Sequence, residues 1–155
     1  MLLRGLLLFF MLSGASYVVA SEQGPLVSGP SPSVLIARLH ALPDAADQVV
    51  ALSRAVDAQV ERGEPGMLLH TFDADPEDAV GFVWTAVYAD SDALLFHLNN
   101  ADLGAYLEAV SPHLDSFTIE LYGAVADEAV AALRATGNSV THYANVLGYI
   151  RDLSP

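Results

Sequence analysis

The residues best suited to chemistry fall between positions 66 and 106 of the chain. His70 lies in an apolar segment, and an imidazole titrates near neutral pH, so it can remove a proton from a phenolic hydroxyl. Trp84 and Tyr88 share one side of a second apolar segment, where they can hold a flat aromatic molecule while Tyr88 donates a hydrogen bond. These residue types predict a small apolar pocket with a few polar groups.

His97 lies among leucines and can either brace this pocket or hydrogen-bond a backbone carbonyl, and the second, structural role is favoured. Each of these residues also has a simpler explanation, because aromatic strand residues and buried histidines usually belong to a core. Asn99 and Asn100 are expected to end a helix rather than to bind a ligand. The predicted catalytic residues are His70, Tyr88 and His97, and the predicted substrate contacts are Phe72, Phe82 and Trp84.

Several other kinds of site are excluded or unsupported. The chain has no cysteine, which rules out disulfides, iron–sulfur clusters, thiolate zinc sites and cysteine nucleophiles. Its histidines are dispersed, without the short His-x-x-x-His spacing that holds a metal ion. No Gly-x-Gly-x-x-Gly, phosphate loop or Gly-x-Ser-x-Gly motif occurs, so nucleotide or flavin binding has no support. We expect neither a metal nor a bound cofactor.

Length and charge limit the partners of this protein. With 155 residues, 53% of them apolar, the chain is long enough for one domain with a real core. It has six arginines, no lysine and nineteen acidic residues, for a formal net charge of -13. Such a surface repels phosphate backbones and anionic lipids, so nucleic acid is not an expected partner.

Residues 1–20 differ from the rest of the chain. Arg4 precedes a short apolar run and then several small residues, the pattern of a secretory signal peptide. Cleavage would place the protein outside the cell, in the periplasm or in the cell envelope. The alternatives are an uncleaved anchor, which alone would bring contact with a membrane, and a wrongly assigned start codon, which would leave the protein in the cytoplasm. Residues 21–32 form a Pro/Gly/Ser linker, and 33–155 form the predicted domain.

The elements that must position these side chains begin with a strand at 33–42. A helix follows to Gly63, with Asp44 as its expected N-cap and one apolar stripe along its length. Charged residues, Asp57 among them, are assigned to the opposite, solvent-facing side of this helix. Gly63 is a suitable stop for the helix because glycine tolerates the backbone angles found at helix ends.

Residues 66–88 predict an antiparallel hairpin around an acidic turn at 73–78. Its first strand alternates, with Leu68, His70 and Phe72 on one side. Both faces of the hairpin are largely apolar, and a sheet apolar on both faces must be covered twice. The chain's own helices can cover one face, and a second subunit could cover the other.

The remaining segments complete the predicted fold. Asp90 and Ser91 cap a helix that runs to Leu98, and helical spacing resumes after the two asparagines until Pro112. Strands at 116–122 and 140–150 flank a helix at 126–136. The order β-α-β-β-α-β with an appended α-β is that of a ferredoxin-like α+β fold with a C-terminal extension.

Three short segments carry a resemblance to a known family: Glu64-Pro65-Gly66, Tyr88-Ala89-Asp90, and the helix from Ala93 to Leu98. Over residues 33–123 the chain resembles the antibiotic biosynthesis monooxygenase superfamily of small dimeric α/β-barrel proteins. The part after Tyr122 resembles an extension found in one uncharacterised branch. The resemblance implies a homodimer whose sheets pack face to face, which would cover the second apolar face of the hairpin.

The resemblance also implies an activity. Members of the superfamily include oxygenases that act on quinols or anthrones without a cofactor, and the implied partner is a small aromatic or quinol-like molecule that reacts with dioxygen. Heme-degrading relatives use an asparagine in the first strand, and Val34 to Leu42 contain none, so that activity is disfavoured. The alternative is a non-catalytic dimer of the same fold that binds a small molecule or acts under stress, because fold alone does not establish catalysis.

Overall fold

The computed structural model describes residues 31–150, so the predictions for residues 1–20 and for nearly all of the linker lie outside the described residues. Within the described part, no helix has the length and apolar character needed to cross a membrane. The elements are β1 (Ser33–Ala41), α1 (Ala46–Gly63), β2 (Met67–Ala74), β3 (Gly81–Tyr88), α2 (Ser91–Leu98), α3 (Ala101–Val110), the short 3-10 helix η1 (Ser111–His113), β4 (Leu114–Gly123), α4 (Asp127–Ala135) and β5 (Ser139–Ala144).

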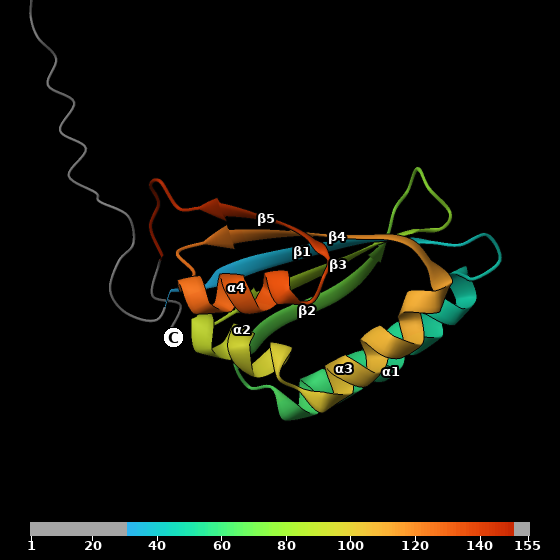
Figure 1. Cartoon of the computed structure of the whole chain (residues 1–155), viewed down its shortest axis with the longest axis horizontal. Coiled ribbons are helices and arrows are strands. Elements are labelled where there is room, and N and C mark those ends of the chain that lie inside the picture. Colours follow the sequence, from blue (N-terminus) through green and yellow to red (C-terminus); the bar gives the residue numbers. More distant parts are fainter. Residues whose placement is uncertain (1–30, 151–155) are drawn as a thin grey trace, which may run out of the picture.

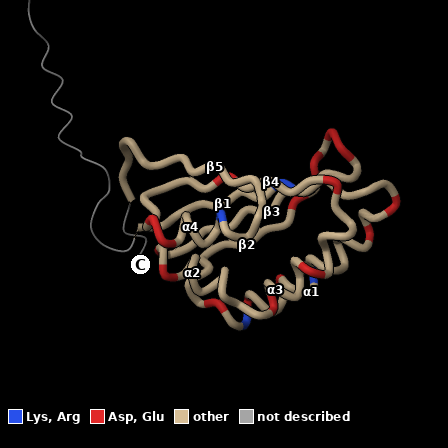
Figure 2. Tube along the Cα trace, in the orientation of Figure 1, with Lys and Arg blue, Asp and Glu red and all other residues tan. Residues whose placement is uncertain are grey.

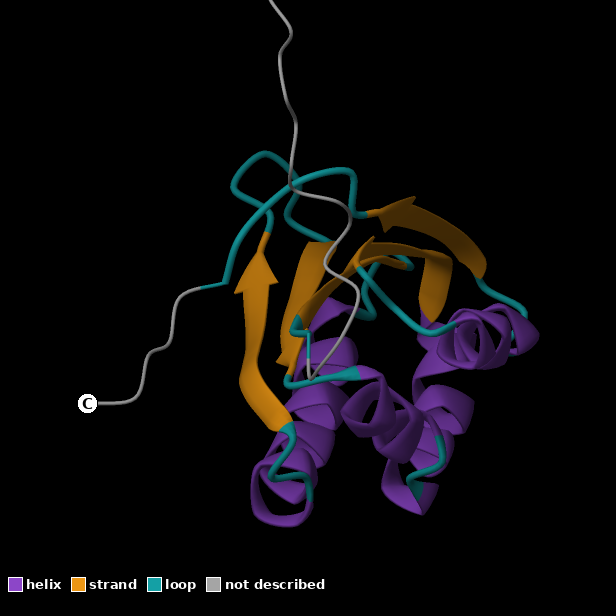
Figure 3. Cartoon of the chain, turned by 90° about the vertical axis from the view of Figure 1, so that its left-hand side faces the viewer, coloured by secondary structure: helices purple, strands orange, loops and turns teal. Residues whose placement is uncertain are grey.

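The strands form a single open sheet in the order β2-β3-β1-β4-β5. The hairpin β2–β3 and both neighbours of β1 are antiparallel, and β5 alone pairs in parallel, with β4. Such a parallel pair needs a crossover, which α4 supplies. The α helices all lie on one face of the sheet (Figures 1 and 3). The predicted α+β fold, its ferredoxin-like order and the appended α-β unit are therefore confirmed.

The core lies between the helices and the inner face of the sheet. Side chains alternate along β1, so Leu35, Ala37 and Leu39 are buried while their neighbours face the other way. The same alternation buries Phe82, Trp84, Ala86 and Tyr88 of β3. The predicted apolar stripe of α1 is present, and its buried residues are Val49, Ser53, Val56 and Val60.

Side chains cap the starts of α2 and α3 but not the start of α1. The Asp90 carboxylate accepts a hydrogen bond from the Ala93 amide at 2.8 Å, as predicted for α2. Asn100 caps α3 by accepting from the Asp102 amide at 2.9 Å. The prediction for Asp44 is wrong: α1 begins at Ala46, and Asp44 sits in a preceding turn with φ of 69°. Asp tolerates this left-handed conformation better than most residues.

Two strand predictions are wrong in detail. Met67 pairs with Tyr88 and Leu69 with Val87, so Leu68 is the extra residue of a bulge and its side chain is 58% exposed, not on the inner side with His70. The last strand ends at Ala144 rather than at residue 150. Its neighbour β4 ends at Gly123, opposite Ala144, so β4 offers no further strand pairing beyond that residue.

The outer face of the sheet has no cover from any described element. At its centre, Val34 of β1 lies opposite Val87 of β3 and Ile36 lies opposite Thr85, and Val83 is a second valine from β3. We call Val34, Ile36, Val83 and Val87 the open face. These side chains are partly exposed, and the helices lie on the other side of the sheet (Figure 3). The prediction that both faces of the hairpin are largely apolar therefore holds for β3, which has buried residues on the inner face and two valines on the outer face.

Candidate functional site

A cavity of about 70 Å³ lies between the inner face of the sheet and the helices, and it is partly open to solvent. Most of its lining is aliphatic, from β1, α1 and α3. The structure brings four of the six predicted site residues to its wall. These four are His70, Trp84, Tyr88 and His97.

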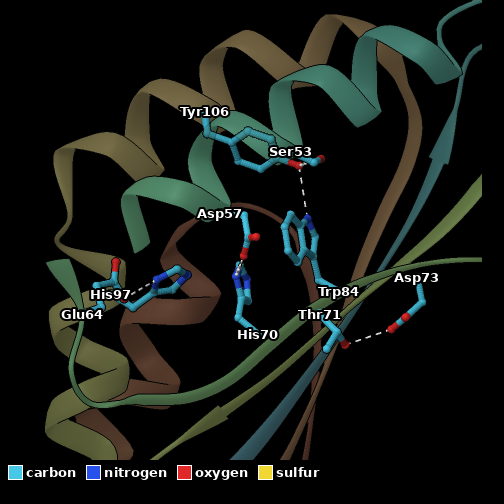
Figure 4. A network of polar contacts seen from close by, with 9 residues as sticks. All are labelled: Ser53, Asp57, Glu64, His70, Thr71, Asp73, Trp84, His97 and Tyr106. Atoms are coloured by element: carbon cyan, nitrogen blue, oxygen red, sulfur yellow. Dashed lines mark hydrogen bonds and ion pairs between the residues drawn. The ribbon is translucent and has the colours of Figure 1, made fainter. Parts of the chain in front are cut away.

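His70 of β2 is held from two sides (Figure 4). Its ring stacks on the Trp84 indole, with a centroid distance of 4.1 Å and 6° between the ring planes. Its Nδ1 lies 2.8 Å from Oδ1 of Asp57 on α1. The assignment of Asp57 to a purely solvent-facing side is therefore wrong. Position 57 borders the apolar stripe, and the 47% exposed side chain still reaches the edge strand β2.

The surroundings of His70 favour its neutral form. Burial lowers the pKa of the imidazole, and this effect exceeds the opposing influence of the hydrogen bond and charge of Asp57, so the pKa lies below the usual 6.5. An ionised carboxylate only accepts hydrogen bonds, so Nδ1 carries the proton and donates to Asp57. In the neutral ring the other nitrogen, Nε2, is then an acceptor. This is the arrangement of a general base.

A second carboxylate–imidazole pair joins Glu64 to His97. Nδ1 of His97 lies 2.8 Å from Oε2 of Glu64, and the Asn100 amide donates to Oε1 of the same carboxylate at 2.6 Å. Glu64 follows the last residue of α1 and is only 3% exposed. Burial alone would raise its pKa, but the hydrogen bonds from His97 and Asn100 and the nearby imidazoles lower it below the usual 4.5. The carboxylate is therefore ionised.

The two pairs meet at the cavity. The ring centroids of His70 and His97 are 6.3 Å apart, and that of Tyr88 is 5.6 Å from His97. Tyr88 is fully buried, and its hydroxyl has no hydrogen-bond partner among the described residues. Burial raises the pKa of this hydroxyl far above its ordinary value, with a further contribution from the charge of Glu64. It stays protonated and is free to donate to a ligand.

Trp84 is fixed by a polar contact on its other side. Its indole Nε1 donates to the Tyr106 hydroxyl at 3.3 Å, and this hydroxyl lies 3.0 Å from Oγ of Ser53 (Figure 4). Phe72 and Phe82 stack on each other with centroids 5.1 Å apart, and Phe72 also contacts the Trp84 ring at 4.5 Å. Phe72 therefore packs against the indole, Phe82 packs against Phe72, and neither phenylalanine lines the cavity.

The partners that hold the predicted site residues were not predicted from the sequence. Asp57, Glu64, Tyr106 and Ser53 hold the catalytic candidates but come from helices or helix ends far away in sequence. Glu64 had one signal, its place in the segment Glu64-Pro65-Gly66. Asn99 ends α2 as expected, whereas Asn100 begins α3 instead of ending a helix and also donates to Glu64. Among the described residues, no group of three or more His, Asp or Glu side chains could hold a metal ion.

Comparison with known families agrees with the fold. The sequence model of the family "Antibiotic biosynthesis monooxygenase" matches residues 32–109, half of the chain. The protein belongs to this family. The match contains β1 to α2 and α3 except its last residue, and thus every residue of the two carboxylate–imidazole pairs, but it ends before β4, α4 and β5. A search of curated proteins gives no match.

Solved structures share the monooxygenase-family fold. One from Caulobacter crescentus CB15, provisionally assigned as an antibiotic biosynthesis monooxygenase, is 22% identical with a TM-score of 0.58 and covers 59% of this chain and 88% of its own. PA3566 from Pseudomonas aeruginosa is 26% identical with a TM-score of 0.54, over 59% of this chain and 91% of its own. Rv0793 from Mycobacterium tuberculosis is 23% identical with a TM-score of 0.54, over 58% and 91%. These likenesses support the ferredoxin-like fold.

Proposed function

We propose that this protein oxidises a small hydroquinol with dioxygen, with His70 as the general base. The observation that carries the proposal is the His70 imidazole, kept neutral by burial and fixed between Asp57 and Trp84 at the wall of an apolar cavity. Membership of a monooxygenase family supports the reaction class. The alternative, a protein that binds such a molecule without reaction, is the other outcome of the experiment below.

The proposed reaction is balanced without an added reductant. Nε2 of His70 removes the phenolic proton, and the resulting electron-rich anion transfers one electron to dioxygen. The two radicals combine to form a carbon–oxygen bond at a ring carbon that carries hydrogen. The hydroperoxide then loses water, which leaves a carbonyl at this carbon. One oxygen atom enters the product, a hydroxyquinone, and the other leaves as water, with both electrons supplied by the hydroquinol.

Two other residues have supporting roles in this proposal. Tyr88 keeps its proton, so it can donate a hydrogen bond to the oxygen of the substrate anion. His97 is held by the buried Glu64 carboxylate, and its second ring nitrogen can orient the ligand beside His70. Fixed donors around a developing negative charge lower its energy most effectively in a site that excludes water.

The test is oxygen uptake by the protein with methylhydroquinone, corrected for spontaneous oxidation. Wild type is expected to consume oxygen well above background. His70→Ala should lower kcat/KM by about a hundredfold or more, because a positioned general base contributes roughly 10²–10⁴-fold. His113→Ala is the matched control, since His113 lies on η1 and does not line the cavity.

Two results would contradict the proposal. One is the absence of uptake above background with any single-ring hydroquinol. The other is uptake that His70→Ala leaves unchanged, which would show that the imidazole removes no proton in the slow step. Saturable binding of the hydroquinol without oxygen uptake would favour the non-catalytic alternative.

We also propose that two copies of the chain pair through the open face. The support is an apolar central surface with no cover from the described helices, which all lie on the opposite side of the sheet. Many acidic residues lie in the 75–78 turn and along the helices (Figure 2), and the carboxylate of Glu120, opposite Ile36 on the outer face, is paired with Arg38. A second copy can therefore approach this face despite the high net charge.

A further inference from the structure

One wall of the cavity comes from the part of the chain that follows the family match. The family model ends at residue 109, and α4 begins at Asp127. Leu133 of α4, with Thr136 and Asn138 in the turn before β5, lines the same cavity as the two histidines. Leu133 is only 2% exposed and is packed into the core. The appended segment is therefore part of the site.

This wall is tied down at both ends of α4. At its start, the Ala126 amide donates to Oγ of Ser91, the first residue of α2, at 2.9 Å. At its end, the Thr136 hydroxyl donates to the Leu133 carbonyl at 2.8 Å and accepts from the Asn138 amide at 3.1 Å. The parallel pairing of β5 with β4 fixes the chain that follows. The bond to Ser91 and the pairing with β4 fix this segment against the rest of the fold, and Leu133 is packed into the core between these two attachments.

The space left beside this wall is small. The cavity measures about 70 Å³, whereas sites for drug-sized ligands measure roughly 300–1,000 Å³. An engineered cavity of about 150 Å³ is enough to hold benzene. The cavity has about half of that volume, so a single ring would fill it and, because the cavity is partly open to solvent, would leave one edge in the opening. A second fused ring would need the volume that the wall side chains occupy.

We propose that α4, through Leu133, limits the ligand to a single aromatic ring and excludes fused two-ring phenols. The ligand class, a phenol or hydroquinol, rests on the function proposed above. The size limit rests on the cavity volume and on the anchored position of Leu133. The segment that follows the family match would then determine the size of the phenols or hydroquinols that can bind in the cavity.

The test is the dissociation constant of two probes, phenol and 2-naphthol, measured by isothermal titration calorimetry. Wild type is expected to bind phenol more tightly than 2-naphthol. A pocket without a size limit would show the opposite order, because 2-naphthol buries more apolar surface. Leu133→Ala should reverse the order, with 2-naphthol affinity increased about tenfold or more, since a Leu→Ala change in a packed core can open roughly 150 Å³.

Leu39→Ala is the matched control. Leu39 is also 2% exposed and loses the same atoms, but it lies on β1 and does not line the cavity. It should leave the preference for phenol unchanged. Leu133→Val removes less volume and is expected to give an intermediate shift, which guards against a variant that folds poorly. Thermal unfolding of each variant in the full chain checks that the fold is retained.

The proposal is overturned if wild type binds 2-naphthol as tightly as phenol, if it binds neither probe, or if Leu39→Ala changes the preference as much as Leu133→Ala. Because phenol and 2-naphthol are titrated without turnover, the size limit is judged separately from catalysis. A preference that responds only to Leu133, together with no uptake of oxygen with methylhydroquinone, would reject the proposed oxidation and keep the size limit.

Discussion

The two carboxylate–imidazole pairs differ in their access to water. The Asp57 side chain is about half exposed, whereas Glu64 is almost completely buried. A proton accepted by His70 can therefore exchange with solvent on the Asp57 side of the ring. The Glu64 pair has no such route and instead keeps a negative charge within the core. We assign proton transfer to the first pair and positioning to the second.

The first prediction concerns the pH dependence of kcat/KM for hydroquinol oxidation. Activity should rise with pH as His70 loses its proton, and the midpoint should lie below 6.5 because burial lowers the pKa of this imidazole. Asp57→Asn removes a charge that raises this pKa, so the midpoint should move to still lower pH. The plateau should also fall by about tenfold or more, because the amide can donate to Nδ1 and place the ring proton on Nε2.

Asp73→Asn is the control for this shift, since it removes the same charge from an exposed position of β2 where the carboxylate accepts a hydrogen bond from Thr71 and not from His70. Its pH profile should match that of wild type. A midpoint that moves upward in Asp57→Asn, or one that does not move, would argue against Asp57 as the partner that sets the protonation of His70.

The second prediction concerns the stability role of Glu64. Its pKa is lowered in the folded protein, so the carboxylate stabilises the fold above about pH 4.5, and this contribution is lost as the pH falls through the lower folded-state pKa. Glu64→Gln should reduce the free energy of unfolding at pH 7 by roughly 3–5 kcal/mol, because one partner of a buried pair is removed. Urea unfolding at pH 7 and pH 4 measures both effects.

The loss in Glu64→Gln relative to wild type should be smaller at pH 4 than at pH 7, since wild type itself begins to lose the charged form. A neutral result at pH 7 would mean that the amide satisfies His97 and Asn100 as well as the carboxylate does. Glu61→Gln, on the exposed side of α1, provides the comparison for simple charge removal.

At the scale of elements, local patterns predicted what local physics determines. Alternation identified the strands, the stripe on α1 identified its buried face, and Asp90 identified a helix start. The partners of the site were missed because they depend on how elements cross. Asp57 reaches His70 only because α1 lies over the edge strand β2. The alternation of side chains along β2 and β3 likewise placed Phe72 and Phe82 on the inner face of the sheet. It could not show where the helices that pack on this face leave a cavity.

The third prediction tests the close approach of β2 to α2. A Cβ added at Gly66 would lie 2.6 Å from the Cβ of Ala93, a contact that cannot be relieved by a flexible side chain. Gly66→Ala should lower the free energy of unfolding by about 1–3 kcal/mol, as other overpacking changes do. The double variant Gly66→Ala/Ala93→Gly should recover part of this loss, which thermal and urea unfolding can measure.

Gly104 offers the opposite case for comparison. It lies within α3, and a Cβ there meets nothing within 4 Å. Gly104→Ala should stabilise the protein by roughly 0.5–1 kcal/mol, because alanine loses less conformational freedom than glycine in a helix. If both alanine variants have the same effect on stability, the contact between Gly66 and Ala93 does not govern the packing of α2.

At the scale of the whole molecule, the sheet separates two functions. Its inner face, with the helices, forms the cavity and both carboxylate–imidazole pairs. Its outer face carries the four apolar side chains of the open face and an ion pair of 3.6 Å between Arg38 and Glu120. Since successive residues of a strand point to opposite faces, β1 and β3 serve both surfaces at once. A substitution on the outer face can therefore be tested for its effect on ligand binding at the inner face.

The fourth prediction uses this separation. Val87→Lys places a charge on the open face between Val34 and Leu69, where pairing of two copies would bury it without a partner, so the variant should be monomeric at concentrations at which wild type is dimeric. Ala131→Lys, on the exposed surface of α4, should remain dimeric like wild type. Light scattering after gel filtration gives the mass of each protein.

Because the cavity lies within one chain, the monomeric variant should still bind phenol with an affinity within about threefold of wild type, a difference below 1 kcal/mol. A wild type that is monomeric would reject pairing through the open face, and a monomeric Val87→Lys that no longer binds phenol while remaining folded would mean that the partner subunit completes the site.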